Sequence, residues 1–144
     1  MGTYTSKYTG EQIDELLGRV ENDGGSGYSE TILYESSTSV SAGANISLTD
    51  SVNNYKQILV ETCCDGATST SICKHIAIIN SSSIIYSNGT NETYSVREDS
   101  GATSSVSFYR LYYGFADDKT IKMIAVDHKD WKNGRISRVT GIKF

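Results

Sequence analysis

The residues best suited to chemistry in this chain are its three cysteines and two histidines. Cys63 and Cys64 are adjacent, and Cys73 and His75 follow in a second apolar segment. Two residues apart in a strand, Cys73 and His75 would share one face, as a cysteine nucleophile and its base require. Nothing else in the sequence marks that pair as activated, and His128 lies in a different predicted strand. We therefore expect no catalytic pair here.

The cysteines also allow structural roles. Structural zinc sites use C-x-x-C spacings on tight turns, which a Cys-Cys dipeptide in a strand does not supply, so we expect no metal. The odd number of cysteines argues against a closed disulfide framework, although one of the adjacent pair could bond to Cys73 across a hairpin. We favour reduced cysteines that pack as small hydrophobic side chains.

Other enzyme signatures are missing from the sequence. It contains no G-x-S-x-G, H-E-x-x-H, phosphate-loop or dinucleotide-binding motif. Paired carboxylates for glycoside hydrolysis would have to come from acids that fall mostly in predicted turns, where Asp ordinarily hydrogen-bonds to nearby backbone. These acids are Asp65, Asp99, Asp117, Asp118 and Asp127. We predict a protein that is not an enzyme and uses no cofactor.

Charge and hydropathy exclude further classes. The 144 residues include 13 basic and 17 acidic side chains, a net charge of −4, with no basic stripe. Binding to nucleic acid needs clustered Lys and Arg, so we expect no nucleic-acid partner. No apolar run is long enough to cross a bilayer, and the N-terminus MGTYTSKYTG has no apolar core of a signal peptide. We expect synthesis in a cytoplasm and no membrane insertion.

A short amphipathic helix is predicted near the N-terminus. Thr9 is a good N-cap, and Gln12 stands at the third helical position, which makes a capping box. The apolar stripe consists of Ile13, Leu16, Leu17 and Val20. A helix of about three turns is only marginally stable in water by itself. The residues that follow it, 21–27, form a Gly-rich linker. We predict that the stripe mediates self-association as a coiled-coil seam, the alternative being packing on its own β-domain.

From residue 28 onward the pattern is that of strands. The fold class that we predict is mostly β: an antiparallel β-sandwich or jelly-roll-like domain over residues 28–144, preceded by the short α-helix and linker of residues 1–27. Strands apolar on both faces should be central. The expected strands are Thr31–Glu35, Ala44–Thr49, Tyr55–Thr62, Ile72–Ile79, Ser83–Ser87, Glu92–Arg97 at an edge, Ser105–Tyr113, Thr120–His128 and Ile136–Phe144. Asn88-Gly89 and Asn133-Gly134 are predicted hairpin turns, the second joining the last two strands.

Aromatic residues are the best candidates for ligand binding. Tyr109, Tyr112 and Tyr113 gather at the end of one predicted strand, and Trp131 stands beside Asp130 in the expected loop between the final two strands. Exposed aromatic rings stack on sugar rings, while acids and amides bond to the hydroxyls. The alternative is that these rings pack in the core or at an interface.

Three segments carry a family resemblance. The opening Tyr8–Leu17 (YTGEQIDELL) resembles a "TG-x-[EQ]-[IV]-D" helix that precedes the distal domains of phage and prophage tail proteins. The segment Ser51–Glu61 and the ending Ile136–Phe144 (ISRVTGIKF) are similar to tail-fibre C-terminal domains of phages of Gram-positive bacteria. The resemblance implies a homotrimer in the virion tail that binds host surface polysaccharide or teichoic acid without chemistry. The three cysteines and the absence of a metal-binding H-x-H pair depart from that pattern.

Three alternatives to a receptor-binding tail-fibre domain stay open at this point. One is an enzyme, such as a small depolymerase or esterase acting on host wall glycan. A carbohydrate-binding module of a bacterial surface protein would share the sandwich but would be monomeric, with the helix serving only as a linker. A structural tail or baseplate adaptor would touch no host.

Overall fold

We describe the fold from a computed structural model, which describes residues 9, 11–12, 27–66, 72–86, 94–100 and 107–144. The chain divides into two compact units, residues 1–29 with Phe144 and residues 30–143. The second unit contains all the hollows and side-chain clusters discussed below.

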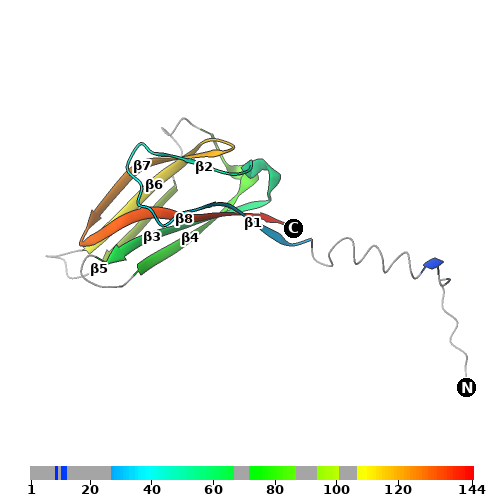
Figure 1. The fold of residues 1–144 in the computed structure, drawn as a ribbon, viewed down its shortest axis with the longest axis horizontal. Helices are drawn as coiled ribbons and strands as arrows, with labels where there is room; N and C mark the ends of the chain where they lie inside the picture. Colours follow the sequence, from blue (N-terminus) through cyan, green and yellow to red (C-terminus); the bar gives the residue numbers. More distant parts are fainter. Residues whose placement is uncertain (1–8, 10, 13–26, 67–71, 87–93, 101–106) are drawn as a thin grey trace, which may run out of the picture. The chain divides into compact units, whose positions relative to one another are not determined.

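The described residues of the second unit are mostly in strands, in agreement with the predicted mostly β class. Eight strands lie in the described residues, and Figure 1 shows them as two layers. They are β1 (Ser29–Glu35), β2 (Asn45–Ser47), β3 (Gln57–Gly66), β4 (Ile72–Asn80), β5 (Tyr94–Ser100), β6 (Ser107–Asp117), β7 (Thr120–Lys129) and β8 (Trp131–Lys143). Two short 3-10 helices, η1 (Val52–Asn54) and η2 (Ser81–Ser83), flank β3 and β4.

The strands form two four-stranded sheets. One has the order β1-β8-β3-β4 and the other β2-β7-β6-β5, and the registers of β2–β7, β3–β4, β3–β8, β5–β6 and β6–β7 are all antiparallel. The predicted edge strand near Glu92–Arg97 is confirmed, since β5 is the last strand of its sheet. The segment Ile72–Ile79, which is apolar on both faces, is nevertheless an edge strand.

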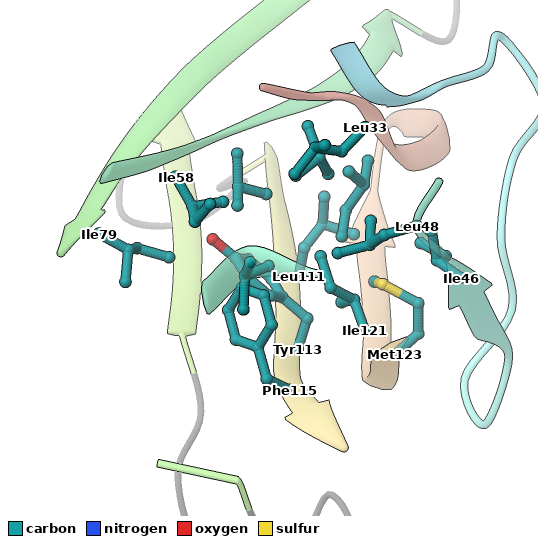
Figure 2. Packing of buried hydrophobic residues seen from close by; sticks show 14 of the residues in the cluster. Leu33, Ile46, Leu48, Ile58, Ile79, Leu111, Tyr113, Phe115, Ile121 and Met123 are labelled. Atoms are coloured by element: carbon teal, nitrogen blue, oxygen red, sulfur yellow. The ribbon is translucent and has the colours of Figure 1, made fainter. Parts of the chain in front are cut away.

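The side chains between the sheets make one core. Leu33, Ile58 and Ile79 of the first sheet belong to the same buried cluster as Leu111 and Met123 of the second. Figure 2 shows these side chains converging from both sheets. Inward-facing residues alternate with outward-facing ones along the strands, as the period of two requires. A core shared by both sheets fixes the register of every strand that contributes to it.

One predicted strand is absent. Ser83–Ser87 was expected to be extended, but the chain forms η2 at Ser81–Ser83 instead, and Ile84–Tyr86 is not part of a strand. The hydroxyl of Ser81 donates hydrogen bonds to the backbone oxygens of Tyr55 and Lys56, and Ile84 N–H bonds to Ser81 O at 3.1 Å. Serine side chains that bond to backbone compete with strand pairing, which is why the segment turns.

The prediction of a hairpin at Asn133-Gly134 is wrong. The last two strands belong to different sheets, and the chain changes sheet at Asp130, whose φ is 62°. Asn133 also has a positive φ, 56°, but lies inside β8. Asp65 pairs with Lys132 and Cys63 with Arg135, so β8 has one extra residue at this point. The Asn-Gly dipeptide therefore makes a β-bulge, which uses the same left-handed backbone as a tight turn.

The capping box predicted at the N-terminus is present. Thr9 N–H donates to Gln12 Oε1 at 2.9 Å, and Gln12 N–H donates to Thr9 Oγ1 at 3.3 Å. Glu11 and Gln12 are helical. The predicted oligomerisation residues Ile13, Leu16, Leu17 and Val20 lie outside the described residues, as does the Asn88-Gly89 turn.

Candidate functional site

An open hollow of about 420 Å³ lies between the β1–β2 connection and the facing ends of β7 and β8. We call it the serine hollow. Its lining residues are Ser39, Val40, Ser41, Ala42, Val126, His128, Lys132, Asn133 and Gly134. Hydroxyl, amide, imidazole and ammonium groups supply both donors and acceptors here, beside small apolar side chains. A few polar groups set among apolar ones suit a small hydroxyl-rich ligand.

Backbone hydrogen bonds hold the β1–β2 connection over this hollow. Val40 N–H donates to Gly134 O at 3.3 Å, and Gly43 N–H donates to Met123 O at 2.7 Å. The first bond reaches β8 and the second reaches β7, so the connection is attached to both sheets. Gly43 has a φ of 87°, a left-handed conformation that glycine adopts without steric cost.

An ion pair between the buried Arg135 and the half-buried Asp65 holds the opposite wall. Arg135 Nη1 lies 3.2 Å from Asp65 Oδ1 and donates to Asn133 O at 2.8 Å, while Asn133 Nδ2 donates to Asp65 Oδ2 at 2.9 Å. The Asn133 hydrogen bond and the neighbouring guanidinium lower the pKa of Asp65, against the opposing effect of burial. The carboxylate therefore stays ionised at neutral pH and holds the bulged segment in place.

A second hollow, of about 400 Å³, carries more charge. We call it the charged hollow; its lining is Glu35, Ser36, Ser37, Glu61, Cys63, Ile72, Lys74, Arg135, Ser137 and Arg138. Lys74 Nζ lies 3.3 Å from Glu61 Oε1, and Arg138 pairs with Glu35.

The carboxyl group of Glu61 is unsuited to acid catalysis. The hydroxyl of Ser137 donates to it at 2.5 Å and lowers its pKa, and Lys74 adds to that effect while burial opposes it. A general acid needs a raised pKa, so this carboxylate is not poised to donate a proton. Its partners join β3, β4 and β8, which is a structural role.

The predicted aromatic cluster is not brought together at the surface. Tyr109 and Tyr113 are both 1% exposed and belong to the core, so their rings cannot stack on a ligand in this structure. Tyr112 is half-buried and pairs with Ala125 on the side of the second sheet that faces away from the core. The strand period separates them, because odd-numbered residues of β6 point inward.

Trp131 and Asp130 stand at the corner where the chain changes sheet. Asp130 is exposed. Trp131 is the first residue of β8 and not part of a loop, and its half-buried ring packs on Tyr109 with centroids 5.8 Å apart. Its neighbour Lys132 lines the serine hollow. The roles in ligand binding that we predicted for Trp131, Asp130 and Tyr112 stay predictions.

The cysteines and His75 divide between two faces. Cys64 is fully buried in the core, and Cys73 packs against it. Cys63 pairs with Lys74 and lines the charged hollow instead. Cys73 Sγ lies 3.6 Å from His75 Nε2. All three thiols are free, and among the described residues no group of three or more His, Cys, Asp or Glu side chains could hold a metal ion.

The outward face of β4 carries an apolar surface that the sequence pattern did not predict. Ile72, Ile76 and Ile78 are 55%, 58% and 66% exposed, and we call them the isoleucine stripe. Strands that are apolar on both faces were expected to be central, but β4 lies at the edge of its sheet. Leu59, half-buried on β3, pairs with Ile78 and extends this surface.

The residues of the serine hollow were also missed. The Ser- and Thr-rich segment from 36 to 41, interrupted only by Val40 and followed by Ala42-Gly43, was available as a signal of an exposed polar loop. Its position over β7 and β8 depends on backbone bonds to residues 80 and 94 positions away in sequence, Met123 and Gly134, which local pattern does not encode.

Comparison with known proteins adds no relative: no family model matches the chain, and no curated protein sequence is similar to it. Within the described ranges, the structure contains no helix of the length and apolarity that crossing a membrane requires.

Proposed function

We propose that this protein is a non-enzymatic attachment domain of a phage tail fibre, which binds host cell-surface glycan. The serine hollow carries the proposal. It is open, it is lined by short hydroxyl, amide and imidazole side chains, and its walls are held by the backbone bonds of the β1–β2 connection and by the Asp65–Arg135 pair. A preformed hollow of this kind binds with little ordering cost.

We infer that the two sheets form a β-sandwich with jelly-roll-like connections. The single core between the sheets supports the sandwich. The pairing of β1 with β8 and of β2 with β7 joins distant segments, as in a jelly roll, whereas β3–β4 and β5–β6–β7 are local hairpins.

Self-association as a homotrimer is part of the proposal. Its support in the described residues is the isoleucine stripe, which Lys74 interrupts between Ile72 and Ile76, since exposed apolar side chains gathered on one face often mark an interface. Association would also multiply weak glycan contacts into stable attachment.

The test measures binding to purified host wall polysaccharide and, separately, to teichoic acid. The decisive variant is K132A, because Lys132 lines the serine hollow. Its matched control is K119A, an equally exposed lysine in the β6–β7 turn at the other end of β7. We expect at least a fivefold rise in Kd for K132A and no change for K119A, while both variants unfold as the wild type does.

Four outcomes would count against the proposal. Equal effects of K132A and K119A would remove the serine hollow from binding. Release of reducing sugar during the incubation would favour an enzyme. A clean monomer by sedimentation would favour a carbohydrate-binding module, and failure to bind any wall polymer or intact host cell would favour a structural adaptor.

A further inference from the structure

The β3–β4 register places two cysteines directly opposite each other. Cys64 pairs with Cys73, in an unbroken antiparallel ladder that also pairs Cys63 with Lys74 and Asp65 with Ile72. Directly opposed residues project their side chains to the same side of a sheet. Here that side is the core, where Cys64 is fully buried and Cys73 packs against the same cluster. Cys63 points to the other face.

The separation of the two backbones fits a disulfide. Opposed residues of antiparallel strands have Cα atoms about 4.5 or 5.5 Å apart, depending on whether the pair is hydrogen-bonded. Disulfides bridge Cα atoms about 4.4–6.8 Å apart, so either kind of pair is compatible. Both thiols are free in this structure.

The surroundings of the two thiols differ in a way that sets an order of reaction. Cys73 is only partly buried, and its Sγ lies 3.6 Å from His75 Nε2 and 3.8 Å from the hydroxyl oxygen of Tyr109. An imidazole at that distance is placed to accept the thiol proton. Cys64 is enclosed, and its thiol donates to Lys132 O at 3.1 Å. Cys73 is therefore the thiol that a reagent from solvent meets first.

We propose that Cys64 and Cys73 are a covalent modification site: they close a cross-strand disulfide when the protein meets a low-molecular-weight disulfide as oxidant. The Cys73 thiolate attacks one sulfur of the reagent, forming a mixed disulfide and releasing one small thiolate. The Cys64 thiolate then attacks the Cys73 sulfur, forms the Cys64–Cys73 bond and releases the second small thiolate. Two cysteine thiols are oxidised, the reagent is reduced to two thiols, and these take up the two protons.

The second step is the slow one. Burial, with a smaller contribution from the neighbouring Asp65, raises the pKa of Cys64 to about 11, so little thiolate is present at neutral pH. The closed bond also ends the donation from Cys64 to Lys132 O. It ties edge strand β4 to β3 beside the wall of the serine hollow.

The test uses the full chain incubated with oxidised glutathione and then alkylated under denaturing conditions. Cleavage before Asp65 separates the peptide with Cys63 and Cys64 from the peptide with Cys73. Tandem mass spectrometry that fragments the chain between Cys63 and Cys64 then identifies which of the two is linked to Cys73. We expect one internal cross-link between the peptides containing Cys64 and Cys73, with Cys63 alkylated. The rate should rise with pH between neutral and alkaline conditions, because the Cys64 thiolate limits it.

The matched control is C63S, which removes the adjacent cysteine on the opposite face. It should cross-link at the wild-type rate. C64S should stop at the mixed disulfide on Cys73. Wild-type protein that retains three alkylatable thiols, or that forms only intermolecular dimers, would overturn the proposal. So would C64S that closes a Cys63–Cys73 bond as fast as the wild type closes its own. The wild-type map alone decides the question if a variant fails to fold.

Discussion

Replacing Asp65 with Asn tests whether the ion pair between Asp65 and Arg135 stabilises the fold because it is shielded from solvent. The side chains of Arg135 and Asp65 are only 10% and 25% exposed. Asp65 accepts from Arg135 with one oxygen and from Asn133 with the other. In D65N the amide nitrogen replaces one acceptor with a donor and the charge is lost, so one bond becomes a donor–donor contact.

The expected loss is about 2–3 kcal/mol of unfolding free energy, since a hydrogen bond to a charged group contributes about 1.5–3 kcal/mol and part of the network survives. Urea unfolding at pH 7, followed by tryptophan fluorescence of Trp131, measures it. With a slope of about 2 kcal/mol per molar, the midpoint should fall by about 1 M.

The control is E35Q, which breaks the pair between Glu35 and Arg138. These side chains are 54% and 47% exposed, so solvent screens their attraction and we expect little change in the midpoint. Equal losses in D65N and E35Q would refute the reasoning from burial.

The pH dependence supplies a second check on the same variant. The folded-state pKa of Asp65 lies below its ordinary value of 3.8. The stability that ionised Asp65 contributes is therefore fully present above pH 3.8. It is lost as the pH falls through the lower pKa of the folded state. The difference in unfolding free energy between wild type and D65N should be constant from pH 7 to about pH 5. It should become smaller below about pH 4. A gap that widens on acidification would contradict the assignment.

Two further substitutions test the packing. A Cβ at Gly141 would lie 2.5 Å from the ring of Tyr55, so G141A should destabilise the protein by about 1–3 kcal/mol or more in thermal unfolding; a Tm equal to that of the wild type would show that the ring has room to move. In the isoleucine stripe, replacing Ile76 and Ile78 with Asp should lower the mass measured by light scattering without changing the circular dichroism spectrum, and an unchanged mass would exclude the stripe from self-association.

Much of the strand pattern could be predicted because it depends on local alternation. Buried and half-buried residues alternate over most of β3 and over the first five residues of β7, as a period of two requires. The capping box was predictable for the same reason, since Thr9 and Gln12 interact within a single turn. The bulge at Asn133 could not be separated from a hairpin turn, because both use a positive φ at an Asn-Gly sequence.

The order of the strands, and with it the candidate site, required long-range pairing. The segment of β4 is apolar on both faces, a pattern that favoured a central strand, but β4 lies at an edge of its sheet and leaves its outward isoleucines exposed. Conversely, Tyr109 and Tyr113 looked like binding residues and are core. A local pattern indicates which residues share a face, but not which face is covered.

The residue pattern was therefore enough to establish a strand-rich chain, the capping box and the net negative charge without a basic stripe. Each of these depends on composition or on neighbours within a few positions. The tertiary structure decided which sheet each strand joins, which of two adjacent cysteines faces Cys73, and where the serine hollow opens. These depend on contacts between residues far apart in sequence. Their free energy comes from a core that exists only when both sheets are assembled.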